Sequence, residues 1–399
     1  MQPGISADLA KYLADHAHSD PDTVVLAGRD IHGYQPAFVA DQLRARQKHR
    51  RRLPSMCADS RIVFPPSLHL EQCSSEQTAR LKSELICRWS DEKKRQTLLD
   101  LTSGFGVDAL AFSRIFQQVI CVEPDVRLME ISRHNNTVLG QSEAIFINRT
   151  AEEYLRDNPA PANWIFIDPS RRRDGRRIIK LADAEPSVPD LLGDMLNVSS
   201  DILIKTSPML DIAEALRSLP AVTQVAVVSV SNECREVLYH IQRNSAFAEP
   251  LMLCFNLPQD GSIGDPFEFR MSEEKSAREE FSEPRQFLFE PHASVLKAGA
   301  FRLAAARFDL FRMESSTHLY TGNQTVQGFP GRTFEIIRPL TRNEHGLEAD
   351  VMVRNHPLKP AEIVKRYNIR EGGEDVVIAF SSRHSKHLVL TRRVDIKKQ

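Results

Sequence analysis

The chain has 399 residues, a length that favours two or three domains over one. Its 52 Lys and Arg residues are balanced by 53 Asp and Glu, so attraction to a polyanion must come from local clusters. The six cysteines form no C-x-x-C pair and the histidines no H-x-x-x-H pattern, so we expect no metal. No apolar run approaches the ~20 residues of a membrane span, and no signal-peptide pattern is present. We therefore expect a cytoplasmic protein.

Residues 1–94 are predicted to be helical. Ser6 precedes an amphipathic run, Pro36 suits a first helical turn, and the S-x-x-Q spacing from Ser74 predicts a capping box. The helix after Pro36 ends in the densest basic run of the chain, RARQKHRRRL. This run could follow a phosphate backbone or be an ordinary basic helix C-terminus, and the sequence leaves both interpretations open.

Between residues 95 and 260, short apolar runs alternate with helix-like segments. The runs are QTLLDLT, QVICVEP, AIFINRT, WIFIDPS and DILIKTS. Strands that alternate with helices are typical of a parallel, doubly wound α/β sheet. AVTQVAVVSV, REVLYHIQ and PLMLCFNL would complete the sheet on one edge, and that edge could turn antiparallel.

In such a sheet, ligands bind beyond the carboxyl ends of the strands. The first strand ends at Asp100, with Gly104 and Gly106 in the loop that follows. The second ends at Glu123, where an acid can bind ribose hydroxyls.

The segment GFGVDA, which follows the first strand, formally fits the dinucleotide fingerprint G-x-G-x-x-A. Asp108 lies in the next helical turn, and a carboxylate about 5 Å from a phosphate costs roughly 3 kcal/mol. S-adenosylmethionine carries a sulfonium and an ammonium but no phosphate, so the acids favour it. Helix capping is the alternative role for Asp100 and Asp108.

The strand ends LLDLTSGFG, CVEPD and FIDPS resemble motifs I, II and IV of the class I S-adenosylmethionine-dependent methyltransferases, over about residues 95–245. The resemblance implies a Rossmann-like doubly wound sheet and a cofactor site with three parts. The methionine end would be surrounded by Asp100, Thr102, Ser103, Gly104 and Gly106. Glu123 would bind the ribose, and Pro124 and Thr150 would lie beside the adenine. Gln72 and Lys82 precede motif I, where this superfamily often closes the methionine pocket; an ordinary capped helix is the alternative.

The strand WIFI is followed by Asp168, Pro169 and Ser170, which resemble the Asp/Asn-Pro-Pro-aromatic motif of amino-methylating enzymes. The resemblance places these three residues at the transferred methyl group. The aromatic residue that stacks on a flipped adenine is replaced by Arg171, which is closer to a form found in some RNA methyltransferases. The substrate-binding residues predicted here are Arg171, Arg172 and Lys205. A solvated basic loop, and a surface lysine beside a carboxylate, are the alternatives.

Beyond residue 260 the alternation is lost, and small α+β modules are predicted. The segment EPHASVLKAGAFRLAAARFDLFRM should be helical, with a glycine inside it. Residues 265–335 would form a ferredoxin-like module. The basic residues 336–399 resemble the THUMP-like modules of a bacterial family of proposed RNA methyltransferases.

These observations together predict a methyltransferase that uses S-adenosylmethionine and acts on structured RNA, tRNA or rRNA, by in-line displacement. Two alternatives stay open at this stage. One is a methyltransferase for a small molecule or protein, and the other is a non-catalytic RNA-binding protein that retains the fold. An NAD-type oxidoreductase would require Asp108 to tolerate a diphosphate.

Overall fold

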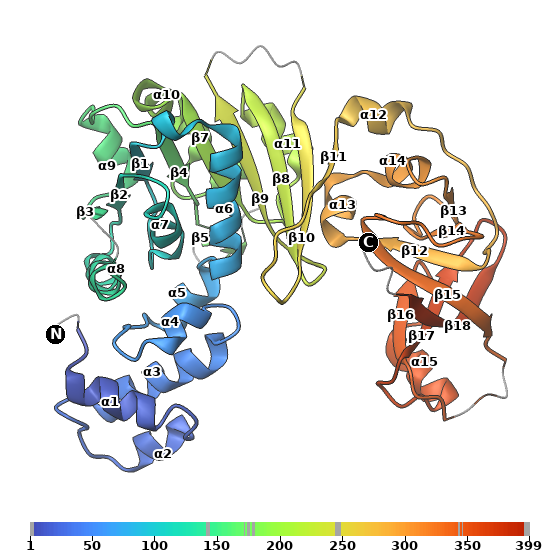
Figure 1. The fold of residues 1–399 in the computed structure, drawn as a ribbon, viewed down its shortest axis with the longest axis horizontal. Helices are drawn as coiled ribbons and strands as arrows, with labels where there is room; N and C mark the ends of the chain where they lie inside the picture. The colour runs from blue at the N-terminus through green and yellow to red at the C-terminus, as the bar shows by residue number, and fades with distance from the viewer. Residues whose placement is uncertain are drawn as a thin grey trace. The chain divides into compact units, whose positions relative to one another are not determined.

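The structure is a computed structural model of the whole chain, shown in Figure 1. It describes residues 4–140, 144–170, 180–243, 249–341, 344 and 346–394, together with the backbone of residues 172–173 and 176–177. The chain divides into two compact units, the first formed by residues 1–223 and 237–247 and the second by residues 224–236 and 248–399.

Helices form the N-terminal part of the first unit, as predicted. They are α1 (Ala7–Asp15), α2 (Pro21–Leu26), α3 (Pro36–His49), α4 (Pro54–Ala58), α5 (Ser67–Gln72) and α6 (Glu76–Trp89), followed by the short turn η1 (Glu92–Lys94). The side chain of Ser6 accepts a hydrogen bond from the backbone of Leu9 and so caps α1. Leu9 and Leu13 of α1 pack against Val39 and Leu43 of α3, so the apolar face of each helix is buried.

The larger sheet has nine strands in the order β11-β10-β8-β9-β7-β4-β1-β2-β3. Those of its central and outer part are β1 (Thr97–Asp100), β2 (Gln118–Val122), β3 (Ala144–Ile147), β4 (Trp164–Ile167), β7 (Asp201–Thr206), β8 (Val222–Val230) and β9 (Glu233–Gln242). From β3 to β7 neighbouring strands are parallel, whereas β9 runs antiparallel to β7. The doubly wound α/β fold predicted from the sequence is therefore confirmed, including the antiparallel turn near its edge.

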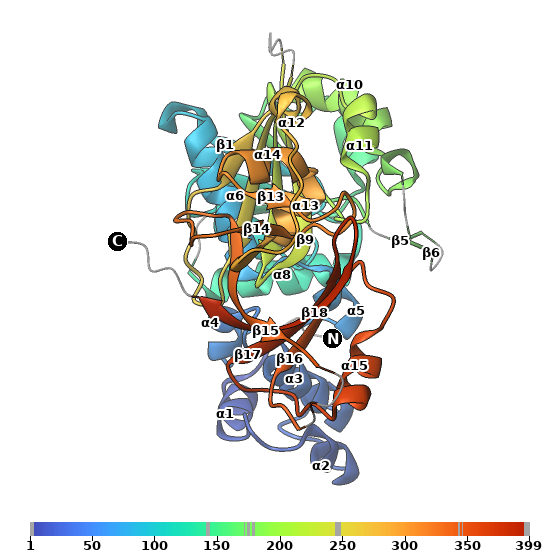
Figure 2. The ribbon, with the colours of Figure 1, turned by 90° about the vertical axis from the view of Figure 1, so that its right-hand side faces the viewer.

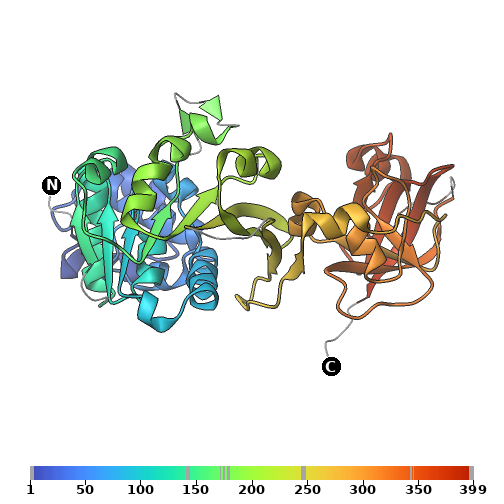
Figure 3. The same cartoon turned by 90° about the horizontal axis from the view of Figure 1, so that it is seen from above.

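All residues of β4 and β7 are buried, which requires cover on both faces of the sheet. Figure 3 shows helices on either side of the strands. The helices between the strands are α7 (Val107–Phe112), α8 (Val126–Val138), α9 (Ala151–Arg156), α10 (Val188–Val198) and α11 (Ile212–Ser218), with the short turn η2 (Leu181–Asp183) before α10. Helix α6 packs on α7, and α9 packs on α10. A separate two-stranded ribbon, β5 (Arg172–Arg173) with β6 (Arg176–Arg177), follows β4.

The second unit contains a seven-stranded sheet in the order β13-β14-β12-β15-β18-β17-β16, visible in Figure 2. Its strands are β12 (Phe287–Pro291), β13 (Phe311–Arg312), β14 (Tyr320–Gly322), β15 (Gly331–Pro339), β16 (Asp350–Arg354), β17 (Asp375–Ser381) and β18 (Lys386–Val394). Its remaining elements are β10 (Leu251–Leu257), β11 (Phe267–Phe269), α12 (Met271–Ser276), α13 (Ala293–Ala298), α14 (Phe301–Ala306) and α15 (Pro360–Tyr367). One sheet thus carries residues from both C-terminal modules that the sequence predicts.

The prediction of one long helix around Gly299 is wrong, because the structure has two short helices there. Gly299 has φ +83° and ends α13, and α14 begins two residues later. This left-handed conformation is open to glycine at little cost, so the residue breaks the helix into two short ones. Among the described residues, no helix is both long and apolar enough to cross a bilayer.

Candidate functional site

Four strands deliver polar side chains to the same edge of the sheet in the first unit. Asp100 ends β1, Glu123 follows β2, Asp168 follows β4, and Lys205 lies near the end of β7. In the parallel registers Asp100 is level with Cys121 of β2 and Phe166 of β4, so these strand ends meet. The sequence predicted that these residues would converge, and the structure brings them together at the edge where open α/β sheets bind ligands.

The loop from residue 101 to residue 106 is tied to both neighbouring strands. Thr102 Oγ1 accepts a hydrogen bond of 2.7 Å from the backbone of Asp168. The backbone N–H of Gly104 donates one of 2.9 Å to Glu123 Oε2. Gly106, at φ +85°, precedes α7, and a Cβ at this position would overlap Ser132 Oγ. The glycine is therefore needed both for the backbone conformation and for the close approach of α8.

Asp100 is a buried acid, only 1% exposed. Its Oδ1 accepts a hydrogen bond of 3.1 Å from Thr102 N. Its Oδ2 and the hydroxyl of Ser103 are buried and have no hydrogen-bond partner among the described residues. Burial raises the pKa of Asp100 well above its ordinary value, and the carboxylates of Asp108, Asp168 and Glu123 raise it further. Two unsatisfied polar atoms and an excess of negative charge suit a cationic ligand with hydrogen-bond donors.

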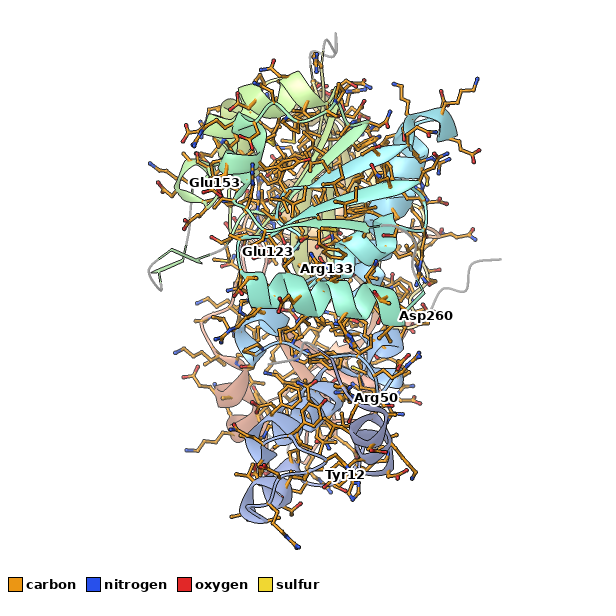
Figure 4. The ribbon with its side chains drawn as sticks, turned by 90° about the vertical axis from the view of Figure 1, so that its left-hand side faces the viewer. Tyr12, Arg50, Glu123, Arg133, Glu153 and Asp260 are labelled. Carbon is orange, nitrogen blue, oxygen red and sulfur yellow. The ribbon has the colours of Figure 1, made fainter. Side chains whose placement is uncertain are left out.

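Glu123 lies at the end of β2, beside the start of α8 (Figure 4). Its Oε1 accepts a hydrogen bond of 2.9 Å from Asp125 N, and its Oε2 accepts the one from Gly104. Burial raises the pKa of Glu123, although these two backbone donors oppose the shift. Each oxygen keeps acceptor capacity, so the carboxylate is oriented and can still bind hydroxyl groups.

Two polar residues follow β3 and take part in local hydrogen bonds. Asn148 was missed, yet its side-chain amide donates to the carbonyls of Glu123 at 2.9 Å and Pro124 at 2.8 Å. A polar residue directly after the third strand was the available signal. Thr150, predicted beside the adenine, caps α9 in a capping box with Glu153. Pro124 itself is exposed.

Asp168 is held by its backbone and by a lysine. Its carboxylate Oδ2 accepts a short hydrogen bond from Lys205 Nζ, while the side chain stays 21% exposed. Pro169 is buried behind it, and Ser170 N donates to the carbonyl of Glu185 at 2.7 Å. Lys205 is fully buried, so the alternative of a surface lysine is wrong, although its pairing with a carboxylate was foreseen.

The side chains of the predicted substrate-binding arginines are not among the described parts of the structure. Arg171 lies outside the described residues, and of Arg172 only the backbone is described, as part of β5. In the ribbon, Arg172 pairs with Arg177 and Arg173 with Arg176.

Asp108 in the first turn of α7 is also buried, but in contrast to Asp100 it has cations beside it. Lys82 Nζ lies 3.1 Å from its Oδ1, and Lys205 Nζ lies 3.9 Å from its Oδ2. Burial would raise the pKa of Asp108, but Lys82, Lys205 and the hydroxyl of Ser74 outweigh it, and the pKa lies below its ordinary value. This compensation corrects the sequence argument, because the charge of Asp108 is balanced by lysines and only the other acids at this edge would repel a diphosphate.

Ser74 has another role than the cap predicted for α6. The helix is capped by Ser75, whose side chain accepts a hydrogen bond from Thr78 N. Ser74 Oγ instead donates to Asp108 Oδ2 at 2.6 Å. The two serines are adjacent, and serine is a favoured N-cap residue at either position, so only the folded chain decides between them.

The basic run at the end of α3 is partly structural. Arg46 is buried, its guanidinium donates to the carbonyls of Gln42 and Ser60, and it lies 5.0 Å from the centre of the Phe64 ring. Burial lowers its pKa to about 10. Arg50 and Arg51 are exposed. Arg46 thus has a structural role, and phosphate contact by the exposed arginines stays a prediction.

Comparison with known proteins identifies one relative over nearly the whole chain and another over about two thirds of it. A solved structure of a proposed methyltransferase from Porphyromonas gingivalis W83 is 30% identical, covers 97% of this chain and 98% of its own, and superposes with a TM-score of 0.82. An uncharacterized S-adenosylmethionine-dependent methyltransferase from Mycobacterium tuberculosis (strain H37Rv) is 22% identical over 281 residues, which are 68% of this chain and 73% of that protein.

Shorter segments match further families. The profile described as Conserved hypothetical protein 95 matches residues 77–182, and a ferredoxin-like domain profile matches residues 287–330. An uncharacterized RNA methyltransferase from Gloeobacter violaceus is 29% identical over 112 residues. That match covers 28% of this chain and 24% of the Gloeobacter protein.

Proposed function

The chain belongs to the methyltransferase family that includes the Porphyromonas gingivalis protein, its Mycobacterium tuberculosis relative is named as S-adenosylmethionine-dependent, and we propose that the chain's substrate is structured RNA, tRNA or rRNA. One observation carries this proposal. The ribbon β5–β6 brings four arginines together directly after Asp168, Pro169 and Ser170. Four arginines on a short ribbon that follows the proposed methyl-transfer residues in the chain would suit a substrate with many phosphates.

The proposed cofactor site uses the unsatisfied polar atoms at the edge of the sheet. Asp100 and the hydroxyl of Ser103 would bind the methionine end, with Thr102, Gly104 and Gly106 forming the loop around it. The charge of the site suits this cofactor. The carboxylate of Asp100 is buried near three other acids, and a bound cation would offset the repulsion between their negative charges. Glu123 would bind the ribose hydroxyls, and Pro124 and Thr150 would lie near the adenine.

When bound, S-adenosylmethionine supplies an activated methyl group. The chain's own contribution would be to position the nucleophile, which in general removes much of the barrier of a bimolecular displacement. Asp168 would accept a hydrogen bond from the attacking group of the substrate. Its partly exposed side chain fits this role, and Pro169 and Ser170 would frame the same position.

RNA binding would draw on charge at more than one place. Arg171, Arg172 and Lys205 were predicted to contact RNA; the full burial of Lys205 favours the two arginines for direct contact. The exposed Arg50 and Arg51 at the end of α3 would add phosphate contacts. The RNA methyltransferase name of the Gloeobacter relative agrees with this substrate class. The THUMP-like character of residues 336–399 remains part of the proposal.

The test is methyl transfer from radiolabelled S-adenosylmethionine to bulk tRNA and rRNA, with Asp168→Ala as the control variant. We expect label in the RNA with the unchanged protein and at least a roughly hundredfold lower rate with the variant. Binding of S-adenosylhomocysteine, measured by calorimetry, should be similar in both proteins. RNA affinity should fall steeply as the salt concentration rises. Label that enters only protein or small molecules, with salt-independent binding, would favour the alternative substrates.

A further inference from the structure

Four ionic side chains of alternating sign, three of them buried and the fourth partly exposed, form a continuous chain in the first unit. They come from four different elements: Lys82 from α6, Asp108 from α7, Lys205 from β7, and Asp168 from the end of β4. Lys82 and Lys205 are each 0% exposed, and Asp108 is 8% exposed. We call these four residues the charge chain.

The contacts within the charge chain differ in length: Asp108 is held by Lys82 and Ser74, whereas Lys205 lies closer to Asp168 than to Asp108. Asp108 is held firmly on one side, since Lys82 Nζ lies 3.1 Å from its Oδ1 and Ser74 Oγ donates to its Oδ2 at 2.6 Å. Lys82 Nζ also donates to Ser74 Oγ at 3.2 Å. Lys205 stands between the two acids, with a close contact to Asp168 and a distance of 3.9 Å to Asp108.

Buried charges interact strongly because little water screens them, and an unpaired one is costly. Asp108 without Lys82 would be a buried anion whose nearest remaining cation is Lys205. It would then compete with Asp168 for that ammonium group. Lys82 therefore satisfies Asp108 and leaves Lys205 directed at Asp168.

We infer that Lys205 is a positioning residue that fixes the Asp168 carboxylate for methyl transfer, and that Lys82 keeps it there by satisfying Asp108. This inference rests on the proposed role of Asp168. It makes α6, which precedes the sheet, a part of the active site. It also explains why a lysine at the end of a buried strand carries no exposed surface.

Within the part of the chain that the structure describes, further ionisable groups lie near the charge chain. Asp100 and Glu123 add negative charge on the cofactor side. Cys73, between α5 and α6, is close enough to feel Lys205, Asp108 and Asp168, but burial raises the pKa of its thiol. A neutral thiol cannot serve as the counterion of Lys205.

The kinetic test uses three variants of the full-length protein, assayed for methyl transfer to bulk RNA. Lys82→Met should lower kcat about tenfold or more, while KM for S-adenosylmethionine changes less than about threefold. Asp108→Asn leaves the buried Lys82 without this anion and should therefore also lower kcat. The double variant, Lys82→Met with Asp108→Asn, should recover most of the lost kcat. Lys11→Met, at an exposed ion pair with Asp15, is the matched control.

A second measurement does not need RNA and remains available if Lys82→Met folds poorly. The ammonium signals of buried lysines can be followed by NMR after lysine-selective ¹⁵N labelling, and the Lys205 signal is assigned by its loss in Lys205→Met. Asp168→Asn should shift this signal strongly, whereas Asp108→Asn should shift it little. The double variant should resemble the unchanged protein.

The outcomes separate this inference from the RNA proposal. Absence of RNA methylation by the unchanged protein would count against the substrate, while the NMR arm would still test the charge chain. Additive losses of kcat in the double variant, with no recovery, would show that Lys82 and Asp108 matter only for folding. A Lys205 signal that responds to Asp108→Asn more than to Asp168→Asn would overturn the inference.

Discussion

Replacement of Asp100 by Asn should stabilise the free protein and weaken its cofactor binding. The side chain is 1% exposed, and its Oδ2 has no hydrogen-bond partner among the described residues. A buried polar atom that is left unsatisfied costs about 1–3 kcal/mol, and more if it is charged. The Asn side chain carries no charge, and in place of the unsatisfied Oδ2 acceptor it can direct an amide N–H donor towards the neighbouring acids. We therefore expect a free energy of unfolding that is about 1–3 kcal/mol higher near pH 8.

Cofactor affinity should move in the opposite direction. Asp100 would give the ligand's ammonium group a charge-assisted hydrogen bond, which contributes about 1.5–3 kcal/mol. Its loss corresponds to a dissociation constant for S-adenosylhomocysteine that is about 10- to 150-fold higher. Urea unfolding gives the stability and calorimetry gives the affinity. A variant that is less stable and binds S-adenosylhomocysteine unchanged would refute the reasoning, because Asp100 would then be a purely structural residue.

The dependence on pH sharpens this prediction. Burial and three neighbouring carboxylates raise the pKa of Asp100 in the folded protein above its unfolded value of about 3.9. The group thus favours the fold while it is protonated, and this contribution is lost as the pH rises through the folded value. The stability gain of Asp100→Asn should be small near pH 4 and should grow towards pH 8. A gain that shrinks as the pH rises would contradict the assigned direction of the shift.

Two further predictions concern the same pocket. Glu123→Ala should abolish measurable S-adenosylhomocysteine binding, because it removes the proposed ribose ligand and the acceptor of Gly104 N. Burial raises the pKa of Glu123, so binding to the unchanged protein should tighten from pH 5 to pH 8. Calorimetry at both pH values checks this. Gly106→Ala should lower the free energy of unfolding by about 1–2 kcal/mol, because its backbone is left-handed and the new Cβ would displace the Ser132 hydroxyl. Urea unfolding measures this change. Gly193→Ala is the control, because its φ is ordinary and the space at its Cβ position is open. Equal stability of the two glycine variants, or Glu123→Ala with unchanged binding, would contradict the pocket described.

The alternation of apolar runs and amphipathic segments determined the doubly wound sheet. The central strands β4 and β7 need continuous apolar stretches because both faces of the sheet are covered there. Parallel strands also end at the same edge, so Asp100, Glu123 and Asp168 could be grouped without knowledge of the structure. The helix around Gly299 shows the limit of this approach, since a periodic pattern does not reveal which glycine adopts the left-handed conformation that ends a helix.

Partners of buried charges were decided by the tertiary structure alone. From the sequence, Asp108 was an uncompensated acid and Lys205 a residue beside a cleft. Lys82 precedes Asp108 by 26 residues in the sequence, and the fold places it against the Asp108 carboxylate. The fold also places Lys205 against Asp168. Charge pairing acts over a few ångströms, whereas sequence patterns report only spacing along the chain. The sequence by itself thus determined the sheet and the edge at which its acids gather, but only the packing of α6 and α7 on that sheet decided which of those acids are neutralised.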